Sequence, residues 1–116
     1  VKNKETGQLF AMKKVRTKKL EEGIPKEALR ELEALQNLEH PNIIKLHQFF
    51  SHSNNLVLII DYLSTDLYNI LQQLEKPLLE SQIKSILQMI LRGLTECHEN
   101  NLMHRDLKPG NLLLDH

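Results

Sequence analysis

A polar loop that runs directly into an apolar triplet constrains this chain more than any other stretch of its sequence. The loop, residues 104–111, reads His-Arg-Asp-Leu-Lys-Pro-Gly-Asn, and the triplet is Leu112 to Leu114. Pro109 fixes its own φ and stiffens the loop, and the triplet predicts a short buried strand that anchors it. A polar turn before a strand could carry these residues by chance, but so long an ordered string argues against chance.

Three side chains of this loop suit one kind of chemistry. Asp106 supplies a carboxylate that can take the proton from an attacking hydroxyl. Lys108 supplies a cation for a phosphoryl group whose negative charge is spread over its oxygens. Asn111 supplies an amide oxygen, a ligand suited to the hard cation Mg²⁺. The loop therefore indicates phosphoryl transfer to an alcohol, with the His104 ring expected to hold the loop by bonding its backbone.

Composition narrows the class of partner. The 116 residues suit one small domain or part of a larger one. Lys plus Arg and Asp plus Glu both number 15, and no apolar run reaches membrane-spanning length. We therefore expect neither a nucleic-acid partner nor a membrane partner. The single cysteine, Cys97, excludes an internal disulfide, and a small buried helix residue is a better interpretation of it than a reactive thiol.

Hydrophobic periodicity predicts a chain of mixed helices and strands. After a turn at Gly7, the expected order is strand 9–15, helix 25–38, strand 43–50, hairpin turn 51–55, strand 56–60, polar connector 61–66, short helix 67–74, long helix 83–94 and strand 112–114. The apolar run 56–60 predicts a strand buried on both faces. Ile and Leu at intervals of three and four predict that the helix over 83–94 faces a core.

Lys13 is an unusual residue for a half-buried strand, and it has two interpretations. It is either an exposed residue of the outer face or, with a carboxylate from the following helix, a phosphate-holding cation. Glu31 is the candidate carboxylate, although alone it would be expected to pair with Arg30 or water. The wider basic stretch 13–19 is expected to be a solvated loop, because Glu21 and Glu22 follow it.

Together these segments resemble the middle of a eukaryotic Ser/Thr protein kinase of the cyclin-dependent kinase group. The motifs that carry the resemblance are Ala-Met-Lys-Lys-Val at 11–15, Gly-Ile-Pro-Lys-Glu-Ala-Leu-Arg-Glu at 23–31, His-Pro-Asn-Ile at 40–43, Thr-Asp-Leu at 65–67 and the stretch 97–113. Lys108-Pro109 is typical of Ser/Thr kinases and argues against a tyrosine kinase. The pattern is most similar to the branches of the CDK-activating kinase and the cell-cycle-related kinase.

The resemblance implies a role for each remaining candidate residue. Lys13, ion-paired with Glu31, would hold the nucleotide phosphates, and Asn111 would bind Mg²⁺. Around the adenine, Ala11 would form the roof, Leu113 the floor and Ile60 the gatekeeper. The backbone of Asp61 and Leu63 would bond the adenine edge, and Asp66 would lie near the ribose. The aliphatic gatekeeper departs from the Phe common in the group and implies a deeper pocket.

The resemblance also implies an α+β, two-lobed kinase fold of which 1–116 is a partial domain. Residues 1–60 would belong to the small lobe, 61–66 to the hinge and 67–116 to the start of the large lobe. The glycine-rich loop is expected before Val1 and the Asp-Phe-Gly segment after His116, so the 116 residues alone are expected to be inactive.

The same resemblance implies ATP and Mg²⁺ as cofactors, a protein substrate, and a location in the cytoplasm or nucleus. A cyclin-like activator would bind the helix at Pro25–Glu31. There the chain reads Pro-Lys-Glu-Ala-Leu-Arg-Glu, where the best-known members have Pro-Ser-Thr-Ala-Ile-Arg-Glu. Two alternatives are a non-catalytic pseudokinase or scaffold on the same fold and a small-molecule kinase. The intact loop argues against the first, and the cyclin-type helix argues against the second.

Overall fold

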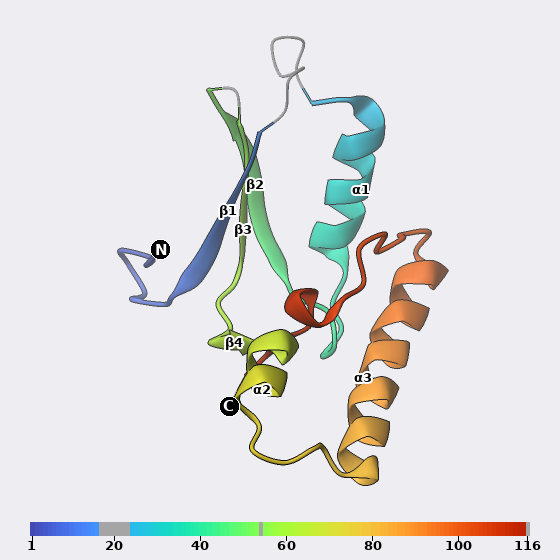
Figure 1. Cartoon of the computed structure of the whole chain (residues 1–116). Helices are drawn as coiled ribbons and strands as arrows, with labels where there is room; N and C mark the ends of the chain where they lie inside the picture. The colour runs from blue at the N-terminus through green and yellow to red at the C-terminus, as the bar shows by residue number, and fades with distance from the viewer. Residues whose placement is uncertain (17–23, 54, 116) are drawn as a thin grey trace. The chain divides into compact units, whose positions relative to one another are not determined.

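The computed structural model of the protein describes residues 1–16, 24–53 and 55–115 (Figure 1). They form two compact units, Val1–Tyr62 and Leu63–His116, which we call the first and the second unit. Of the basic stretch 13–19 expected as a solvated loop, residues 13–16 belong to a strand, so the expectation is wrong for them, and residues 17–19 lie outside the described residues. Strands and helices are both present in the described residues, as the α+β prediction requires.

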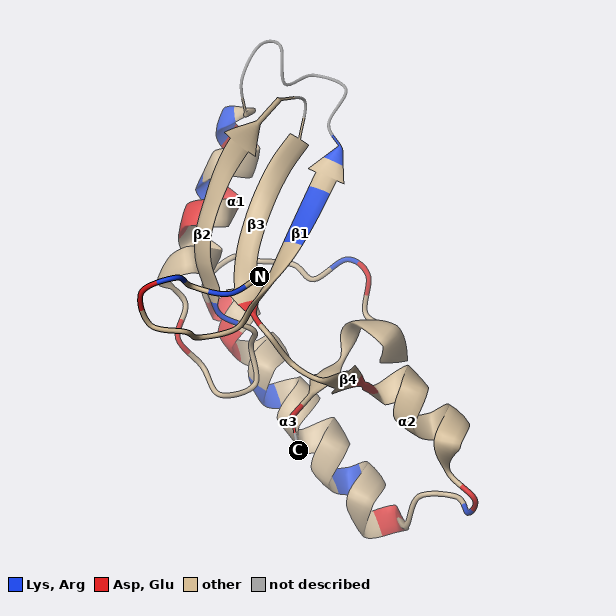
Figure 2. Ribbon diagram, turned by 90° about the vertical axis from the view of Figure 1, so that its left-hand side faces the viewer, with Lys and Arg blue, Asp and Glu red and all other residues tan. Residues whose placement is uncertain are grey.

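The first unit is built on a three-stranded antiparallel sheet. Its strands are β1 (Phe10–Arg16), β2 (Leu46–His52) and β3 (Asn55–Asp61), in the order β1-β3-β2 (Figure 2). Val57 of the central strand is 2% exposed, but its neighbours on β3 keep partial exposure. The prediction of burial on both faces is therefore wrong for most of β3, because the one described helix of this unit packs against β2.

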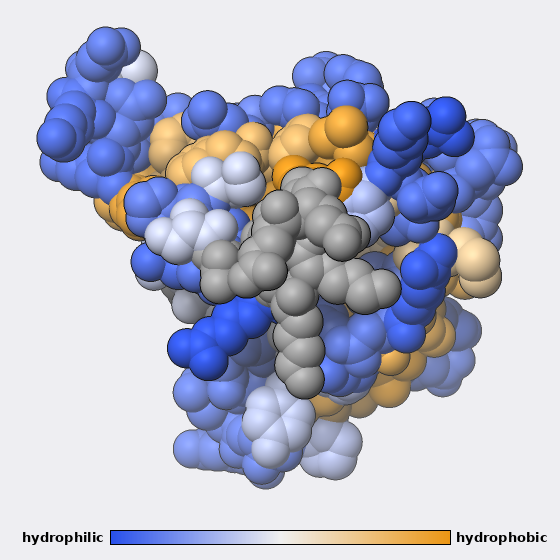
Figure 3. All heavy atoms as spheres, turned by 90° about the horizontal axis from the view of Figure 1, so that it is seen from above, coloured by the Kyte–Doolittle hydropathy of each residue, from blue (hydrophilic) through white to orange (hydrophobic). Residues whose placement is uncertain are grey.

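One helix, α1 (Lys26–Asn37), accompanies this sheet. It begins one residue after Pro25 and ends one residue before the predicted end, because Leu38 takes extended backbone with ψ 128°. Leu38 and Leu46 are buried, and they form the core of the unit together with Val57. Burying such a side chain fully contributes about 1.5–3 kcal/mol. Seen from above (Figure 3), hydrophobic residues remain visible between hydrophilic ones.

The strand boundaries of the first unit differ slightly from the prediction. Gly7 has a φ of 76°, as the expected turn requires, but Leu9 pairs with Lys2 in an isolated bridge and β1 begins one residue later. The second predicted strand starts three residues late, at β2. Before it, the Ile43 N–H donates to the His40 carbonyl at 3.1 Å and closes a turn. Backbone groups committed to this turn cannot join the sheet ladder.

The second unit joins a two-stranded sheet to short and long helices. Its elements are β4 (Thr65–Asp66), α2 (Leu67–Gln73), α3 (Glu80–Glu99), the 3₁₀ helix η2 (Pro109–Asn111) and β5 (Leu113–Leu114). The predicted polar connector thus ends in a strand, which pairs with β5. Leu113 is 40% exposed, so the prediction of a buried strand is wrong here: β5 has two residues and pairs with β4 alone.

Helix α3 is longer and more exposed than predicted. It begins where the Gln82 side chain accepts the Leu79 N–H at 2.9 Å, a capping arrangement that satisfies a free donor. Of its residues only Gly93 is buried, while Leu87 and Leu91 are 51% and 61% exposed. The prediction of a core-facing helix is therefore wrong for the described part of the chain, whose short elements in this unit are too small to cover it. Neither α3 nor any other helix of the described residues could span a bilayer.

Candidate active site

The loop at 104–111 brings its three predicted functional side chains into direct contact. The Asp106 carboxylate lies 2.9 Å from the Lys108 ammonium, measured from Oδ2 to Nζ. Asn111 Nδ2 donates to the same Oδ2 at 2.8 Å and to the Asp106 carbonyl at 2.7 Å. The hydrogen bond from Lys108, followed by that from Asn111, lowers the pKa of Asp106 below its ordinary value. Asp106 is therefore held in its ionised, proton-accepting form.

The backbone of the loop explains how a short segment assembles this cluster. Arg105 has a φ of 61°, in the left-handed region, and turns the chain. The Asp106 N–H then donates to the His104 carbonyl at 2.9 Å and lies 3.3 Å from its ring Nδ1. The ring thus bonds backbone, as expected. Pro109 opens η2, where its missing N–H costs no hydrogen bond, and the 3₁₀ turn brings Asn111 back to Asp106.

The donor set of the loop fits a magnesium ion. Both bonds of the Asn111 side chain use its nitrogen, so they leave its oxygen for a cation. Mg²⁺ is usually bound by one or two protein oxygens together with substrate phosphates and water. Among the described residues no group of three His, Cys, Asp or Glu could hold a metal. A site of this kind would therefore rely on the ligand's own oxygens.

Two predicted neighbours of the nucleotide, Asp66 and Leu113, are opposite each other in the β4–β5 ladder. Asp66 also caps α2: its two carboxylate oxygens accept from the backbone and side-chain nitrogens of Asn69, each at 2.8 Å. The Leu67 N–H donates to the Leu112 carbonyl at 2.8 Å, which ties the start of α2 to the residue after η2. The roles of Asp66, Leu113 and Leu63 toward a nucleotide stay predictions.

In the first unit, the strand ladder gathers three further candidates on one face of the sheet. Ala11 on β1 lies directly opposite Ile60 on β3, and Lys13 lies opposite Leu58. Residues opposite each other, or two apart on one strand, share a face. The predicted roof, gatekeeper and phosphate-holding cation are thus neighbours. Glu31 lies on α1 of the same unit, and its ion pair with Lys13 stays a prediction.

The carboxylate of Asp61 makes contacts that the sequence did not predict. Its Oδ1 lies 2.5 Å from His47 Nε2, and its Oδ2 accepts the Lys45 N–H at 3.2 Å. His47 was not among the predicted site residues. The sequence signal that could have identified His47 was a histidine inside an apolar strand pattern. Its partner depends on the register between β2 and β3, which periodicity does not reveal.

Cys97 lies partly buried on α3 and is a free thiol. Burial, and secondly the negative charge of Glu96, raise the pKa of this thiol above its ordinary value. Because the thiolate is the reactive form, both effects make Cys97 less nucleophilic at neutral pH. The helix position and the low reactivity agree with the interpretation of Cys97, but the residue is partly buried and not fully buried as expected.

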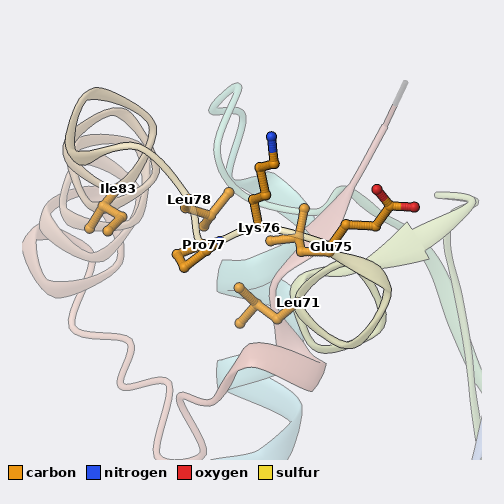
Figure 4. Close-up of a pocket in the computed structure, with 7 residues that line it drawn as sticks. Leu71, Glu75, Lys76, Pro77, Leu78 and Ile83 are labelled. Carbon is orange, nitrogen blue, oxygen red and sulfur yellow. The ribbon is translucent and has the colours of Figure 1, made fainter.

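A pocket of about 540 Å³ lies in the second unit between the end of α2 and the start of α3 (Figure 4). Its lining is mostly apolar and consists of Leu71, Leu74, Glu75, Lys76, Pro77, Leu78 and Ile83. None of the predicted site residues lines this pocket. It therefore adds no group to the chemistry of the loop.

Comparison with known proteins agrees with this geometry. Residues 1–116 match the family described as "Protein kinase domain". Over 114 residues, the chain is 46% identical to cyclin-dependent kinase 20 of Danio rerio, 44% identical to that of Homo sapiens and 45% identical to that of Rattus norvegicus. Each alignment covers 97% of this chain and 33% of the relative. The chain thus spans about a third of the length of these relatives.

Proposed function

The chain belongs to the protein kinase domain family, as its motifs predicted, and from this premise we propose that the protein is an ATP-dependent Ser/Thr kinase of the cyclin-dependent group. The reaction would transfer the γ-phosphoryl group of Mg-ATP to a protein hydroxyl. One observation supports this most strongly: Asp106 is held ionised by both Lys108 and Asn111. A base, a cation and a metal-ligand oxygen thus converge at one place.

Each side chain of the loop would have its own part in the transfer. Asp106 would accept the proton of the substrate hydroxyl as that oxygen attacks phosphorus. Lys108, already within 2.9 Å of Asp106, would stabilise the negative charge on the transferred phosphoryl group. The Asn111 oxygen would bind Mg²⁺, which neutralises the charge of the nucleotide phosphates when it is present. The Asn111 nitrogen would keep Asp106 oriented.

The sheet face of the first unit would bind the nucleotide. Ala11 and Ile60 are opposite each other and would contact the adenine, and Lys13 on the same face would hold its phosphates. The backbone of Asp61 and Leu63 would bond the adenine edge. These roles come from the family likeness, and the shared face of Ala11, Lys13 and Ile60 supports them.

The family likeness also supports a protein substrate and a cyclin-like activator bound at α1. Lys26, Glu27 and Arg30 are exposed in the first turns of that helix and are the charged groups an activator would contact. The charge at Lys26 and Glu27 would favour a partner different from that of kinases with uncharged residues there. The protein would act in the cytoplasm or nucleus.

The test measures transfer of the γ-phosphoryl group from Mg-ATP to a peptide library containing Ser, Thr or Tyr acceptors, using the intact protein with and without candidate cyclins. We expect phosphate on Ser and Thr only. Asp106→Asn should lower turnover by about 10²–10⁴-fold, equivalent to about 3–5 kcal/mol of barrier.

A matched control is Glu99→Gln, which changes an exposed carboxylate at the end of α3 and should leave turnover unchanged. Nucleotide binding without any transfer would favour the pseudokinase alternative instead. Equal turnover of Asp106→Asn and wild type would refute the assignment of Asp106.

A further inference from the structure

A β-bulge interrupts the pairing of β2 with β3 at His47. Leu46 pairs with Ile60 and Gln48 pairs with Ile59, so His47 is the extra residue on its strand. An extra residue loses its place in the ladder and turns its side chain in a new direction. The carbonyl of His47 accepts a hydrogen bond from Gln36 Nε2 of α1 at 2.8 Å. The bulge is thus held by a specific side chain and is a fixed feature of the unit.

The ring of His47 is held between two strands. On one side it meets the Phe10 ring of β1 edge-to-face, with centroids 4.8 Å apart and an interplanar angle of 76°. On the other side Nε2 lies 2.5 Å from Asp61 Oδ1. A carboxylate can only accept, so Nε2 carries the hydrogen. The two side chains are 35% and 40% exposed, so water competes only in part for this bond.

The second oxygen of the Asp61 carboxylate accepts a hydrogen bond that a backbone carbonyl would accept in a regular ladder. The Asp61 N–H donates to the Lys45 carbonyl at 3.2 Å. In a regular antiparallel pair, the Lys45 N–H would return a bond to the Asp61 carbonyl. Here it donates at 3.2 Å to Asp61 Oδ2 instead. The Asp61 side chain thus accepts this bond in place of the Asp61 backbone carbonyl, and that carbonyl receives no hydrogen bond from the Lys45 N–H.

On the other side of β3, the Phe10 amide of strand β1 does not bond the Asp61 carbonyl either. Phe10 lies opposite Asp61, but its N–H donates to the Val1 carbonyl at 2.8 Å. The Lys45 ammonium is also engaged elsewhere, at 3.0 Å from Glu39 Oε1. His47 is therefore the side chain that holds the Asp61 carboxylate, and among the described residues 1–16, 24–53 and 55–115 the backbone neighbours of the Asp61 carbonyl leave it available to a ligand.

We propose that His47 is a positioning residue for nucleotide recognition: by holding the Asp61 carboxylate in the ladder, it keeps the Asp61 carbonyl free to accept from the 6-amino group of adenine. This inference rests on the proposed nucleotide site, in which Asp61 bonds the adenine edge. Without His47, the carboxylate can leave the Lys45 N–H, and the Asp61 carbonyl returns to the ladder.

The test compares two nucleotides that differ only in the group concerned. Purine riboside triphosphate lacks the 6-amino group of ATP, so the ratio of the two dissociation constants measures recognition of that group. In the intact wild-type protein we expect ATP to bind about 3- to 10-fold more tightly, as one hydrogen bond allows. In His47→Leu this preference should fall close to one, through weaker binding of ATP alone. His52→Leu, an exposed histidine of the same strand, is the control and should keep the preference.

Two further variants guard against a merely structural effect. In His47→Gln the amide nitrogen can still donate to Asp61, so the preference should be retained. In Asp61→Ala no side-chain oxygen remains to accept from the Lys45 N–H, so this N–H can bond the Asp61 carbonyl and the preference should be lost even though His47 is present. Asp61→Ala also decides the question if His47→Leu does not fold.

The outcomes separate this inference from the proposed function. If the wild type binds neither nucleotide, the proposed nucleotide site fails, and this inference fails with it. If the wild type binds both equally, nucleotide binding stands and the inference is overturned. If His47→Leu and Asp61→Ala keep the wild-type preference, His47 does not position the carbonyl. A loss of affinity for both nucleotides in equal measure would show a structural role only, and it would also overturn the inference.

Discussion

The two units hold their predicted site residues in different ways. In the second unit, Asp106 and Asn111 are five positions apart and bond each other directly, with Lys108 between them. In the first unit, Ala11 and Ile60 come from opposite ends of the unit's sequence and meet only because β1 and β3 pair. The loop is therefore a locally built site, whereas the sheet face exists only when the whole sheet has formed.

Because of this difference, we expect nucleotide binding and phosphoryl transfer to respond to variants in different parts of the chain. The sheet-face site depends on strand pairing, and strand pairing depends on the packed core. A variant that disrupts this core should therefore displace Ala11, Lys13 and Ile60 together. A site made by a stiff loop depends on a few hydrogen bonds and responds to single side chains. We expect variants of the first unit to change nucleotide affinity as well as turnover, and variants of the loop to change turnover with nucleotide affinity nearly intact.

Damage to the core of the first unit should give the largest effect. Leu46, the first residue of β2, is 0% exposed. Leu46→Ala would leave a cavity and lower the free energy of unfolding by about 2–5 kcal/mol, measured by chemical denaturation of the intact protein. Met12→Ala removes an exposed side chain of β1 and should cost much less. Similar losses for the two variants would show that Leu46 does not belong to a packed core.

Lys13 and Glu31 test whether the sheet face and α1 form one phosphate-binding device. Lys13→Met and Glu31→Gln should each lower turnover by about 10²-fold, because a misplaced phosphate disturbs the reacting geometry. The double variant should be far less than additive, with a coupling of about 1–3 kcal/mol. Steady-state kinetics of the four proteins provide this cycle. Independent, multiplying effects would mean that Glu31 has no part in holding Lys13.

The loop makes a smaller, pH-dependent prediction. The bond from Lys108 is the first cause of the lowered pKa of Asp106, which favours the ionised form. Lys108→Met should therefore raise that pKa, so that Asp106 takes up its proton at a higher pH than in the wild type. A carboxyl ¹³C titration by NMR measures the midpoint. Lys84→Met, which removes a lysine paired with Glu80 on α3, should leave it in place. An unchanged midpoint in Lys108→Met would contradict the observed contact.

Much of this architecture could be predicted from sequence, for a physical reason. Helices α1 and α3 and the strands show local periodicity, and Asp106, Lys108 and Asn111 form a local motif within one loop. Each of these features depends on residues that are close together in the sequence. The α+β fold class and the family were both confirmed. What local patterns give is element type and the chemistry of neighbouring side chains.

The features that were missed depend on distant residues. The pairing of β4 with β5 joins 65–66 to 113–114; a strand was predicted at 112–114, but nothing in Thr65-Asp66 indicates the strand that pairs with it. The bulge at His47 follows from its register against β3, and the exposure of α3 follows from the small size of the elements beside it. Register and coverage are properties of the assembled unit, so they could not be read from periodicity alone.

The separation of binding from chemistry is the central claim, and the affinity of Asp106→Asn for Mg-ATP tests it most directly. Asn keeps the shape of Asp106 and can still accept from Asn111, so the loop should stay in place. Isothermal titration calorimetry should give a dissociation constant within about 2-fold of the wild type, a difference of less than 0.5 kcal/mol. Lys13→Met, measured alongside it, should bind more weakly. A large loss of affinity in Asp106→Asn would show that the loop itself binds the nucleotide, and would contradict the account.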